Sequence, residues 1–180
     1  MIHVVTLEPF DADRSQAICR ALFTAYGVGC ELSGELELPD DAEGPEGLDA
    51  EKLLSEAEQV KTFADDKVLY LVQRTLAPRP SPVGPLPTHG FARYGGDRAV
   101  ASAGSLPGRD DGEAATLART LAIAKLAVHQ VGHLWELHHC LDARCAMAPP
   151  WGVAWAKSNQ PELCAFCREK SERRMKTAPA

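Results

Sequence analysis

The chain has 180 residues, of which 45% are apolar and 24% charged, and it carries a formal net charge of −6. This length and balance fit one soluble globular domain whose hydrophobic core needs no disulfide bonds. The acidic charge argues against a nucleic-acid partner, because proteins that bind nucleic acid usually present a basic face. The sequence also argues against membrane insertion, since the most apolar stretch, Ala114 to Val128, is interrupted by Arg119 and Lys125.

The expected compartment is the cytoplasm. Glu8, Asp11 and Asp13 interrupt the first residues, which therefore lack the pattern of a secretory signal peptide. Disulfide bonds are rare in the cytoplasm, so metal binding or free thiols explain the six cysteines better than a disulfide framework. Cys19 and Cys30 stand apart from the other four and are expected to be buried as small apolar side chains.

The N-terminal half alternates strand-like and helix-like segments. Runs of β-branched and apolar residues predict three strands, at residues 2–7, 28–38 and 67–76. The second of these alternates apolar and polar residues and is expected to be half-exposed, whereas the third is expected to be central. One helix is predicted from Asp11 or Asp13 to about Tyr26, with Gly27 ending it, and Asp49 caps a second helix.

Residues 78–87 contain five prolines, and we call them the proline segment. Each proline removes a donor from a strand ladder, so this segment is expected to be a stiff surface loop. Two interpretations of the proline segment stay open: it is a tolerated insertion, or it has a role in binding. Residues 90–106 alternate small and apolar side chains and predict one or two edge strands. The basic tail from Arg168 is expected to fray.

A long helix, apolar on most sides, is predicted from Glu113 to about Trp135. His129 and His133 are four residues apart on it and therefore share one face, so both imidazoles can reach the same ion. Four of the six histidines lie within residues 128–140. Metal ligation explains this concentration better than core packing.

Four cysteines form two closely spaced pairs separated by a loop. They read Cys140-x4-Cys145 and, after eighteen intervening residues, Cys164-x2-Cys167. This spacing is typical of a tetrahedral zinc site made of four thiolates.

The histidine and cysteine patterns are adjacent in the sequence and together form one longer motif. It reads His129-Gln130-Val131-Gly132-His133, Glu136, His139-Cys140, Cys145-Ala146-Met147 and Cys164-Ala165-Phe166-Cys167. The string resembles the archaemetzincins, metzincin-type zinc metallopeptidases whose signature places HExxHxxGxxHC before a CxM segment and a closing CxxC. A weaker resemblance extends over nearly the whole chain.

The resemblance implies an α+β, metzincin-like zincin fold. A small mixed twisted sheet would pack on an active-site helix, with an additional C-terminal four-cysteine zinc site. It implies a single domain over residues 1–180. Within it, 1–109 would form the sheet and helix part, 110–139 the active-site helix with the histidine zinc site, and 140–180 the Met-turn with the four-cysteine zinc subdomain.

The resemblance further implies two zinc ions. The catalytic-type zinc would be bound by three imidazoles, those of His129, His133 and His139. The structural zinc would be bound by four thiolates, those of Cys140, Cys145, Cys164 and Cys167. Met147 would form the Met-turn beneath the first ion, and the segment from Phe91 to Leu106 would supply the edge strand along which a peptide lies.

Position 130 departs from the family signature, because it holds glutamine in place of glutamate. In this chemistry zinc acidifies a water molecule, and the glutamate takes its proton and passes it to the leaving amine. Gln130 can hold the water by a hydrogen bond but cannot accept the proton. Loss of a general base typically lowers the rate by a factor on the order of 10² to 10⁴. The metal can persist, since the glutamate is not a ligand.

Position 136 holds glutamate where the signature has glycine. Glycine lets the helix end in a left-handed turn that returns the third histidine to the metal, and another residue costs roughly 1–2 kcal/mol there. Two outcomes are open. Either zinc binding outweighs this cost, or the helix continues and places Glu136 about 10.5 Å along the axis from His129, too far for both to reach one zinc. The Glu136 carboxylate is a candidate substitute base or a hydrogen-bond partner of a metal ligand, and His138 can be tested in the same way.

These residues predict a zinc metallopeptidase homologue that hydrolyses peptide bonds weakly or not at all. Two alternatives stay open: an inactive pseudo-enzyme that binds peptides or regulates, and an interaction module in which only the four-cysteine zinc site matters. A peptide or protein is the expected substrate or ligand. The sequence carries no readable sign of oligomeric state or cleavage preference.

Overall fold

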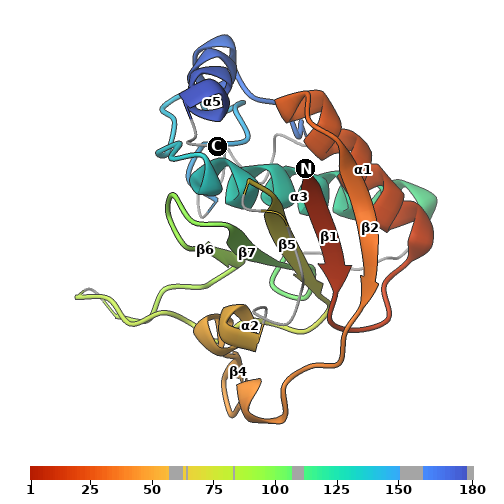
Figure 1. Cartoon of the computed structure of the whole chain (residues 1–180). Coiled ribbons are helices and arrows are strands. Elements are labelled where there is room, and N and C mark those ends of the chain that lie inside the picture. Colours follow the sequence, from red (N-terminus) through yellow and green to blue (C-terminus); the bar gives the residue numbers. More distant parts are fainter. Residues whose placement is uncertain (57–62, 64, 83, 107–111, 151–159, 178–180) are drawn as a thin grey trace.

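The computed structural model describes residues 1–56, 63, 65–82, 84–106, 112–150 and 160–177. The strands are β1 (Ile2–Thr6), β2 (Cys30–Glu35), β3 (Glu43–Gly44), β4 (Gly47–Leu48), β5 (Lys67–Val72), β6 (Gly90–Ala92) and β7 (Arg98–Ser102). The helices are α1 (Ala12–Tyr26), the short 3-10 helix η1 (Asp40–Ala42), α2 (Ala50–Glu56), α3 (Glu113–Leu134) and α5 (Ala165–Thr177). Figure 1 shows α1 and α3 together on one side of the sheet and α2 on the other.

Five strands form one mixed sheet with the order β2-β1-β5-β7-β6. The first four are parallel, and β6 runs antiparallel to β7 at one edge. Strand β5 is central, as predicted for residues 67–76. Two strands form within residues 90–106, but only β6 is an edge strand, because β7 lies between β5 and β6. The predicted α+β fold with a small mixed sheet is confirmed.

Strand β2 forms within residues 28–38, but the half-exposed pattern predicted for it is wrong. It occupies the other edge of the sheet, and all its side chains from Glu31 to Glu35 are exposed. Cys19 and Cys30 are half-buried rather than buried, and both pack against the core.

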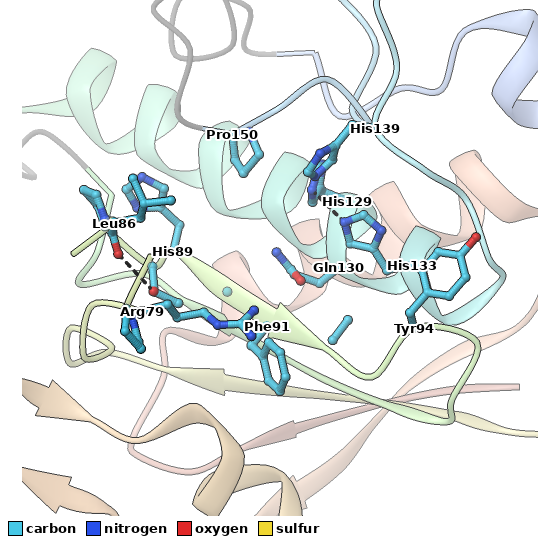
Figure 2. A pocket seen from close by; sticks show the side chains of 15 residues that line it. Arg79, Leu86, His89, Phe91, Tyr94, His129, Gln130, His133, His139 and Pro150 are labelled. Carbon is cyan, nitrogen blue, oxygen red and sulfur yellow. Dashed lines mark hydrogen bonds between the residues drawn. The ribbon is translucent and has the colours of Figure 1, made fainter. Parts of the chain in front are cut away.

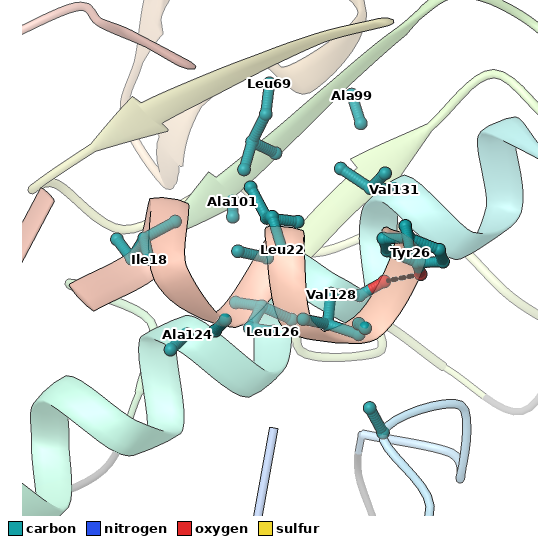
Figure 3. Packing of buried hydrophobic residues seen from close by; sticks show 14 of the residues in the cluster. Ile18, Leu22, Tyr26, Leu69, Ala99, Ala101, Ala124, Leu126, Val128 and Val131 are labelled. Atoms are coloured by element: carbon teal, nitrogen blue, oxygen red, sulfur yellow. Dashed lines mark hydrogen bonds between the residues drawn. The ribbon is translucent and has the colours of Figure 1, made fainter. Parts of the chain in front are cut away.

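Period-two alternation along the strands divides the core between the two faces of the sheet. On one face, Leu69 of β5 and Ala99 and Ala101 of β7 pack against α1 and α3, as Figure 3 shows. On the opposite face, Tyr70 and Val100 pack with residues of β4 and α2. The C-terminal half of α3, which carries the histidine pair, is therefore embedded in the core.

Helix α1 has the predicted ends. Of the two candidate caps, Asp11 is the one used, because its Oδ1 accepts the Arg14 N–H at 2.8 Å. Gly27 follows the helix with a φ of 68°, and its N–H donates to the Phe23 carbonyl at 2.8 Å. Glycine suits this left-handed position because it has no side chain to clash with the backbone.

The prediction of a frayed tail from Arg168 is wrong. Residues 168–177 belong to helix α5, in which Cys167 and Ser171 are buried and Met175 packs against the core, whereas residues 178–180 lie outside the described residues. The helix is stable there because one of its sides lies against the rest of the molecule, including α1. No described helix is long and apolar enough to cross a membrane.

Tyr26 joins the end of α1 to the part of α3 that carries the histidines. Its hydroxyl donates to the Val128 carbonyl at 2.5 Å, and its ring packs on Trp135 with the centroids 4.5 Å apart. Both Tyr26 and Val128 are buried. The contact therefore fixes α1 against the histidine-bearing turns of α3.

Replacing Tyr26 with phenylalanine is expected to lower the free energy of unfolding by about 1 kcal/mol, because the hydrogen bond to Val128 is lost while the ring stays. Alanine is expected to cost about 3–5 kcal/mol, because the missing ring leaves a cavity beside Trp135. Chemical denaturation of the metal-loaded protein measures both. Phe23→Ala is the control, because Phe23 lies on the same helix with 58% of its surface exposed. Equal losses of unfolding free energy in the Tyr26→Ala and Phe23→Ala variants would contradict the role of Tyr26 in fixing α1 against α3.

Candidate metal centre

Helix α3 presents His129 and His133 one turn apart, with their ring centroids separated by 4.7 Å. His129 Nδ1 lies 2.8 Å from the Ala146 carbonyl oxygen, and His133 Nδ1 lies 2.8 Å from that of Leu137. A carbonyl oxygen only accepts, so both Nδ1 atoms carry protons and donate them. The two Nε2 atoms face each other at 3.0 Å.

Burial holds the pKa of both imidazoles below the usual range, to about 3 for His129 and about 4 for His133. Both rings are therefore neutral at pH 7, and the facing Nε2 atoms present only lone pairs. Two lone pairs at this distance repel each other unless a cation lies between them. On a tetrahedral zinc ion, with Zn–N bonds of about 2.0–2.1 Å, two imidazole nitrogens would be roughly 3.3 Å apart, so the pair fits such an ion.

Helix α3 ends at Leu134, and a left-handed residue, Glu136, follows with a φ of 56°. The Leu137 N–H donates to the Gly132 carbonyl at 3.0 Å, and the Glu136 N–H donates to that of His133 at 3.1 Å. These are the two bonds of a Schellman motif, in which Glu136 takes the place usually held by glycine. The helix therefore ends here, and the alternative of a continued helix is wrong.

Three contacts from outside the helix hold this turn. Tyr94 Oη donates to the Glu136 carbonyl at 2.7 Å, and Arg174 Nη2 lies 2.9 Å from Glu136 Oε2. The Gly95 N–H donates to the His133 carbonyl at 2.9 Å. These contacts offset the roughly 1–2 kcal/mol that a left-handed glutamate costs.

The left-handed turn returns the chain so that His139 lies beside the helical pair. Its ring centroid is 5.2 Å from that of His129 and 5.2 Å from that of His133. One nitrogen of each ring lies within 4.8 Å of the others, so the three residues, which we call the histidine group, could hold one metal ion. His138 lies outside the group. It stacks on Tyr94, with its Nε2 2.9 Å from the Tyr94 hydroxyl.

Met147 packs against α3 at Gly132, between the two helical histidines along the chain. The Met147 sulfur and the Tyr26 hydroxyl occupy the place where a Cβ at position 132 would stand. Met147 is fully buried, and its carbonyl accepts the Cys140 N–H at 2.8 Å. Met147, the residue predicted for the Met-turn, is thus buried against the part of α3 that carries the histidines.

Four thiols form a second group, which we call the cysteine group. Their sulfur atoms all lie within 4.8 Å of one another, and the members are Cys140, Cys145, Cys164 and Cys167. Cys140 Sγ and Cys164 Sγ are 3.8 Å apart, far beyond a disulfide bond. Two thiolates on a tetrahedral zinc ion, with Zn–S bonds of about 2.3 Å, would also be roughly 3.8 Å apart.

Hydrogen bonding already favours a thiolate in this group. The Cys167 thiol lowers the pKa of Cys145 to about 5, and the Cys164 N–H contributes by donating to Cys145 Sγ at 3.3 Å. Burial raises the pKa of Cys140, and the bond to Cys145 raises that of Cys167. One negative charge beside three thiols suits a cation, which releases the remaining protons when it binds.

The two groups share one short segment of chain. His139 and Cys140 are neighbours in the sequence, and Ala146, whose carbonyl orients His129, lies between Cys145 and Met147. The Ala146 N–H donates to the Glu162 carbonyl at 2.8 Å, two residues before Cys164. Whatever fixes the cysteine group therefore also fixes the backbone that orients the histidine group.

A cleft of about 430 Å³ opens beside the histidine group (Figure 2). It is lined by all three members of that group, by residues of β6 and by part of the proline segment. Aspartate and glutamate do not occur among its described lining residues. Glu136 is absent from this lining, and its carboxylate faces Arg174, so the geometry does not favour it as a substitute base.

Gln130 also lines the cleft, and it is only 4% exposed. It lies against Gly90 of β6, where an added Cβ would stand 2.8 Å from Gln130 Cγ and Cδ and 2.7 Å from the Val100 carbonyl oxygen. Glycine at position 90 is what allows the edge strand to approach the helix this closely. The amide is therefore held between the strand and the histidines, in the position predicted for the general base.

The sequence comparisons agree with this arrangement. Residues 117–173, which hold both groups, match the model of Peptidase family M54. Comparison with curated proteins finds no significant match.

The fold has clear relatives among solved structures. The archaemetzincin of Methanopyrus kandleri is 23% identical, with a TM-score of 0.78 over 97% of this chain and 94% of its own. The archaemetzincin of Archaeoglobus fulgidus, solved in complex with malonate, is 18% identical, with a TM-score of 0.74 over 94% and 98%. A zinc-dependent peptidase from Methanocorpusculum labreanum is 20% identical, with a TM-score of 0.77 over 95% and 100%.

This chain therefore has the archaemetzincin fold, and the resemblance predicted from its sequence is confirmed. Both candidate metal groups consist of predicted residues: the spacing had singled out His129, His133 and the four cysteines, and the resemblance added His139. Sequence reasoning missed Tyr94, Gly90 and the Ala146 carbonyl. The first two carry no motif, and the third is a backbone group that every residue possesses.

Replacing Glu136 with glycine is expected to raise the free energy of unfolding by about 1 kcal/mol, because relief of the left-handed strain exceeds the loss of a half-exposed ion pair. Glu136→Ala is expected to be destabilising, because it keeps the strain and loses the pair. Arg174→Gln removes the pair alone and serves as the control. Chemical denaturation measures the stability of all three variants. A glycine variant no more stable than the alanine variant would contradict the claim that Glu136 is strained in the left-handed conformation.

Replacing Cys164 with serine is expected to weaken zinc binding at the histidine group as well, by about tenfold, because the Ala146 carbonyl and the His139–Cys140 segment lose their anchor. His129→Ala is expected to leave the cysteine group able to bind zinc. Elemental analysis and competition with a chromophoric chelator measure both variants. Undiminished affinity at the histidine group of the Cys164→Ser protein would contradict the coupling.

Proposed function

We propose that this chain is an archaemetzincin-type zinc metallopeptidase homologue whose hydrolytic activity is reduced by Gln130. One zinc ion is held by the histidine group and a second by the cysteine group. The observation that carries this proposal is the presence of three convergent imidazoles, Gln130 and an edge strand around a single cleft. The match to Peptidase family M54 and the zinc-dependent peptidase among the structural relatives support it.

The donor atoms suit zinc at both places. Three imidazoles with an open position are typical of catalytic zinc, and four thiolates are typical of structural zinc. When bound at the histidine group, zinc supplies Lewis acidity that polarises a peptide carbonyl and acidifies water. The Ala146 and Leu137 carbonyls orient His129 and His133, because each accepts the Nδ1 proton and leaves Nε2 directed at the ion.

The peptide ligand is proposed to lie along β6. Among the described strands it pairs only with β7, so its other edge offers backbone groups to an extended peptide. Strand β6 and Gln130 line the same cleft, which places such a peptide beside the histidine group. The Gln130 amide can hold a water molecule by hydrogen bonds, but it has no group that accepts a proton at neutral pH.

A second candidate function is peptide binding without turnover. The lack of aspartate or glutamate among the described residues of the cleft favours it, because no neighbouring carboxylate replaces the missing base. The two candidates differ in one measurable respect. Prolonged incubation of zinc-loaded protein with bound peptides yields metal-dependent products in the first case and none in the second.

Replacing Gln130 with glutamate is expected to raise the rate of peptide hydrolysis by a factor on the order of 10² to 10⁴, because the carboxylate accepts the proton that the amide cannot. The two side chains have nearly the same shape, so zinc content and peptide affinity are expected to stay unchanged. Mass spectrometry of a peptide library, with elemental analysis of the same samples, measures both.

Gln16→Glu is the matched control, because it makes the same chemical change at an exposed position of α1. It is expected to leave the rate unchanged. A Gln130→Glu protein that contains two zinc ions and binds peptides but cleaves none would overturn the peptidase assignment. A protein that binds zinc only at the cysteine group would favour the interaction module instead.

A further inference from the structure

Part of the proline segment lines the cleft, and hydrogen bonds hold its backbone. Arg79 and Leu86 pair through their backbones, with N–O distances of 3.0 and 2.9 Å. The Ser81 hydroxyl donates to the Gly84 carbonyl at 2.6 Å, and the Gly84 N–H donates back to the Ser81 carbonyl at 3.1 Å. Several prolines further restrict the backbone of this segment. Arg79 therefore stands on a stiff, hairpin-like support.

The Arg79 side chain extends along the cleft. Its guanidinium carbon lies 4.5 Å from the centre of the Phe91 ring, in edge strand β6. Figure 2 shows Arg79 and Phe91 across the cleft from the three histidines. Stacking on an aromatic ring occupies one face of the guanidinium and leaves the N–H groups at its edge free to donate.

The charge of Arg79 is not balanced within the described structure. Among the described residues that line the cleft, no other side chain is permanently charged. Asp49 and Glu51 line an adjoining hollow of about 290 Å³ that Arg79 also borders. Neither carboxylate forms an ion pair with Arg79, and Arg79 has no ion-pair partner among the described residues. A chain of net charge −6 thus presents an exposed cation at its cleft.

We propose that Arg79 binds a carboxylate of the peptide and so selects peptides that present a carboxylate in the cleft. The inference rests on the proposed function, because it assumes that a peptide occupies the cleft. The planar guanidinium donates two parallel hydrogen bonds to a carboxylate, which a neutral amide cannot accept in the same way. The carboxylate is either an aspartate or glutamate side chain or the free C-terminus of the peptide, and the two sources are separable by experiment.

The test is peptide binding to the zinc-loaded, full-length protein, measured by fluorescence anisotropy. One series of alanine-based octapeptides carries a single glutamate at each position in turn, and a matched series carries glutamine. Every peptide is made with a free and with an amidated C-terminus. We expect at least one carboxylate to improve the affinity about tenfold, which is typical of a charged hydrogen-bonded contact. Preference for glutamate indicates a side chain, and preference for the free acid indicates the C-terminus.

Arg79→Gln is expected to abolish this preference while the affinity for the neutral peptides stays within about twofold of that of the unaltered protein. Arg79→Lys is expected to keep part of the preference, because it retains the charge without the planar pair of donors. Arg20→Gln is the matched control, because it removes the same charge from an exposed position of α1 outside the cleft.

Two results would overturn the inference while leaving the proposed function intact. They are equal binding of all the peptides by the unaltered protein, whether or not they carry a glutamate or a free C-terminus, and an Arg79→Gln variant that keeps the preference. Failure of every peptide to bind a protein that contains two zinc ions would overturn the proposed function and this inference with it. Unfolding curves of the variants verify that each one is folded before binding is compared.

Discussion

The histidine group depends on the way helix α3 ends. Two of its imidazoles come from one helix face and need only helical geometry, but His139 reaches them only because the chain reverses at Glu136. That reversal uses a backbone conformation which a glutamate adopts at a cost of roughly 1–2 kcal/mol. Contacts from Tyr94 and Arg174 hold it, so two distant parts of the chain determine whether the third imidazole is in place.

The same few residues also connect the two metal groups. The cysteine group begins at the residue after His139, and the carbonyl that orients His129 belongs to Ala146, next to Cys145. Helix α5, which starts at the closing pair of cysteines, supplies the arginine that pairs with Glu136. The cysteine group thus gives the histidine group a framework in addition to the sheet.

The sequence was most informative where the chemistry is local. The i, i+4 histidines, the paired cysteines and the capped helix α1 all follow from spacing within one element or one motif. The outcome at Glu136 could not be predicted, because the strain of a left-handed residue is similar in size to the tertiary contacts that offset it. The tail could not be predicted either, since α5 is stabilised by packing of Cys167 and Ser171 rather than by its own amphipathic pattern. Likewise, the close approach of Gly90 to Gln130 depends on how a strand and a helix meet in space.

The bond from the Gly95 N–H to the His133 carbonyl has a mechanical consequence. The loop that follows edge strand β6 is attached to the very turn of helix that carries a candidate metal ligand, and Tyr94 in the same loop is attached to the next turn of the chain. Strand and ligand therefore share one rigid frame, so a fluctuation that displaces the strand carries the histidine with it. Reactions between a bound chain and a fixed ion tolerate errors of only about 0.5 Å. The linkage consists of a few hydrogen bonds outside position 130, so it does not depend on which residue stands there.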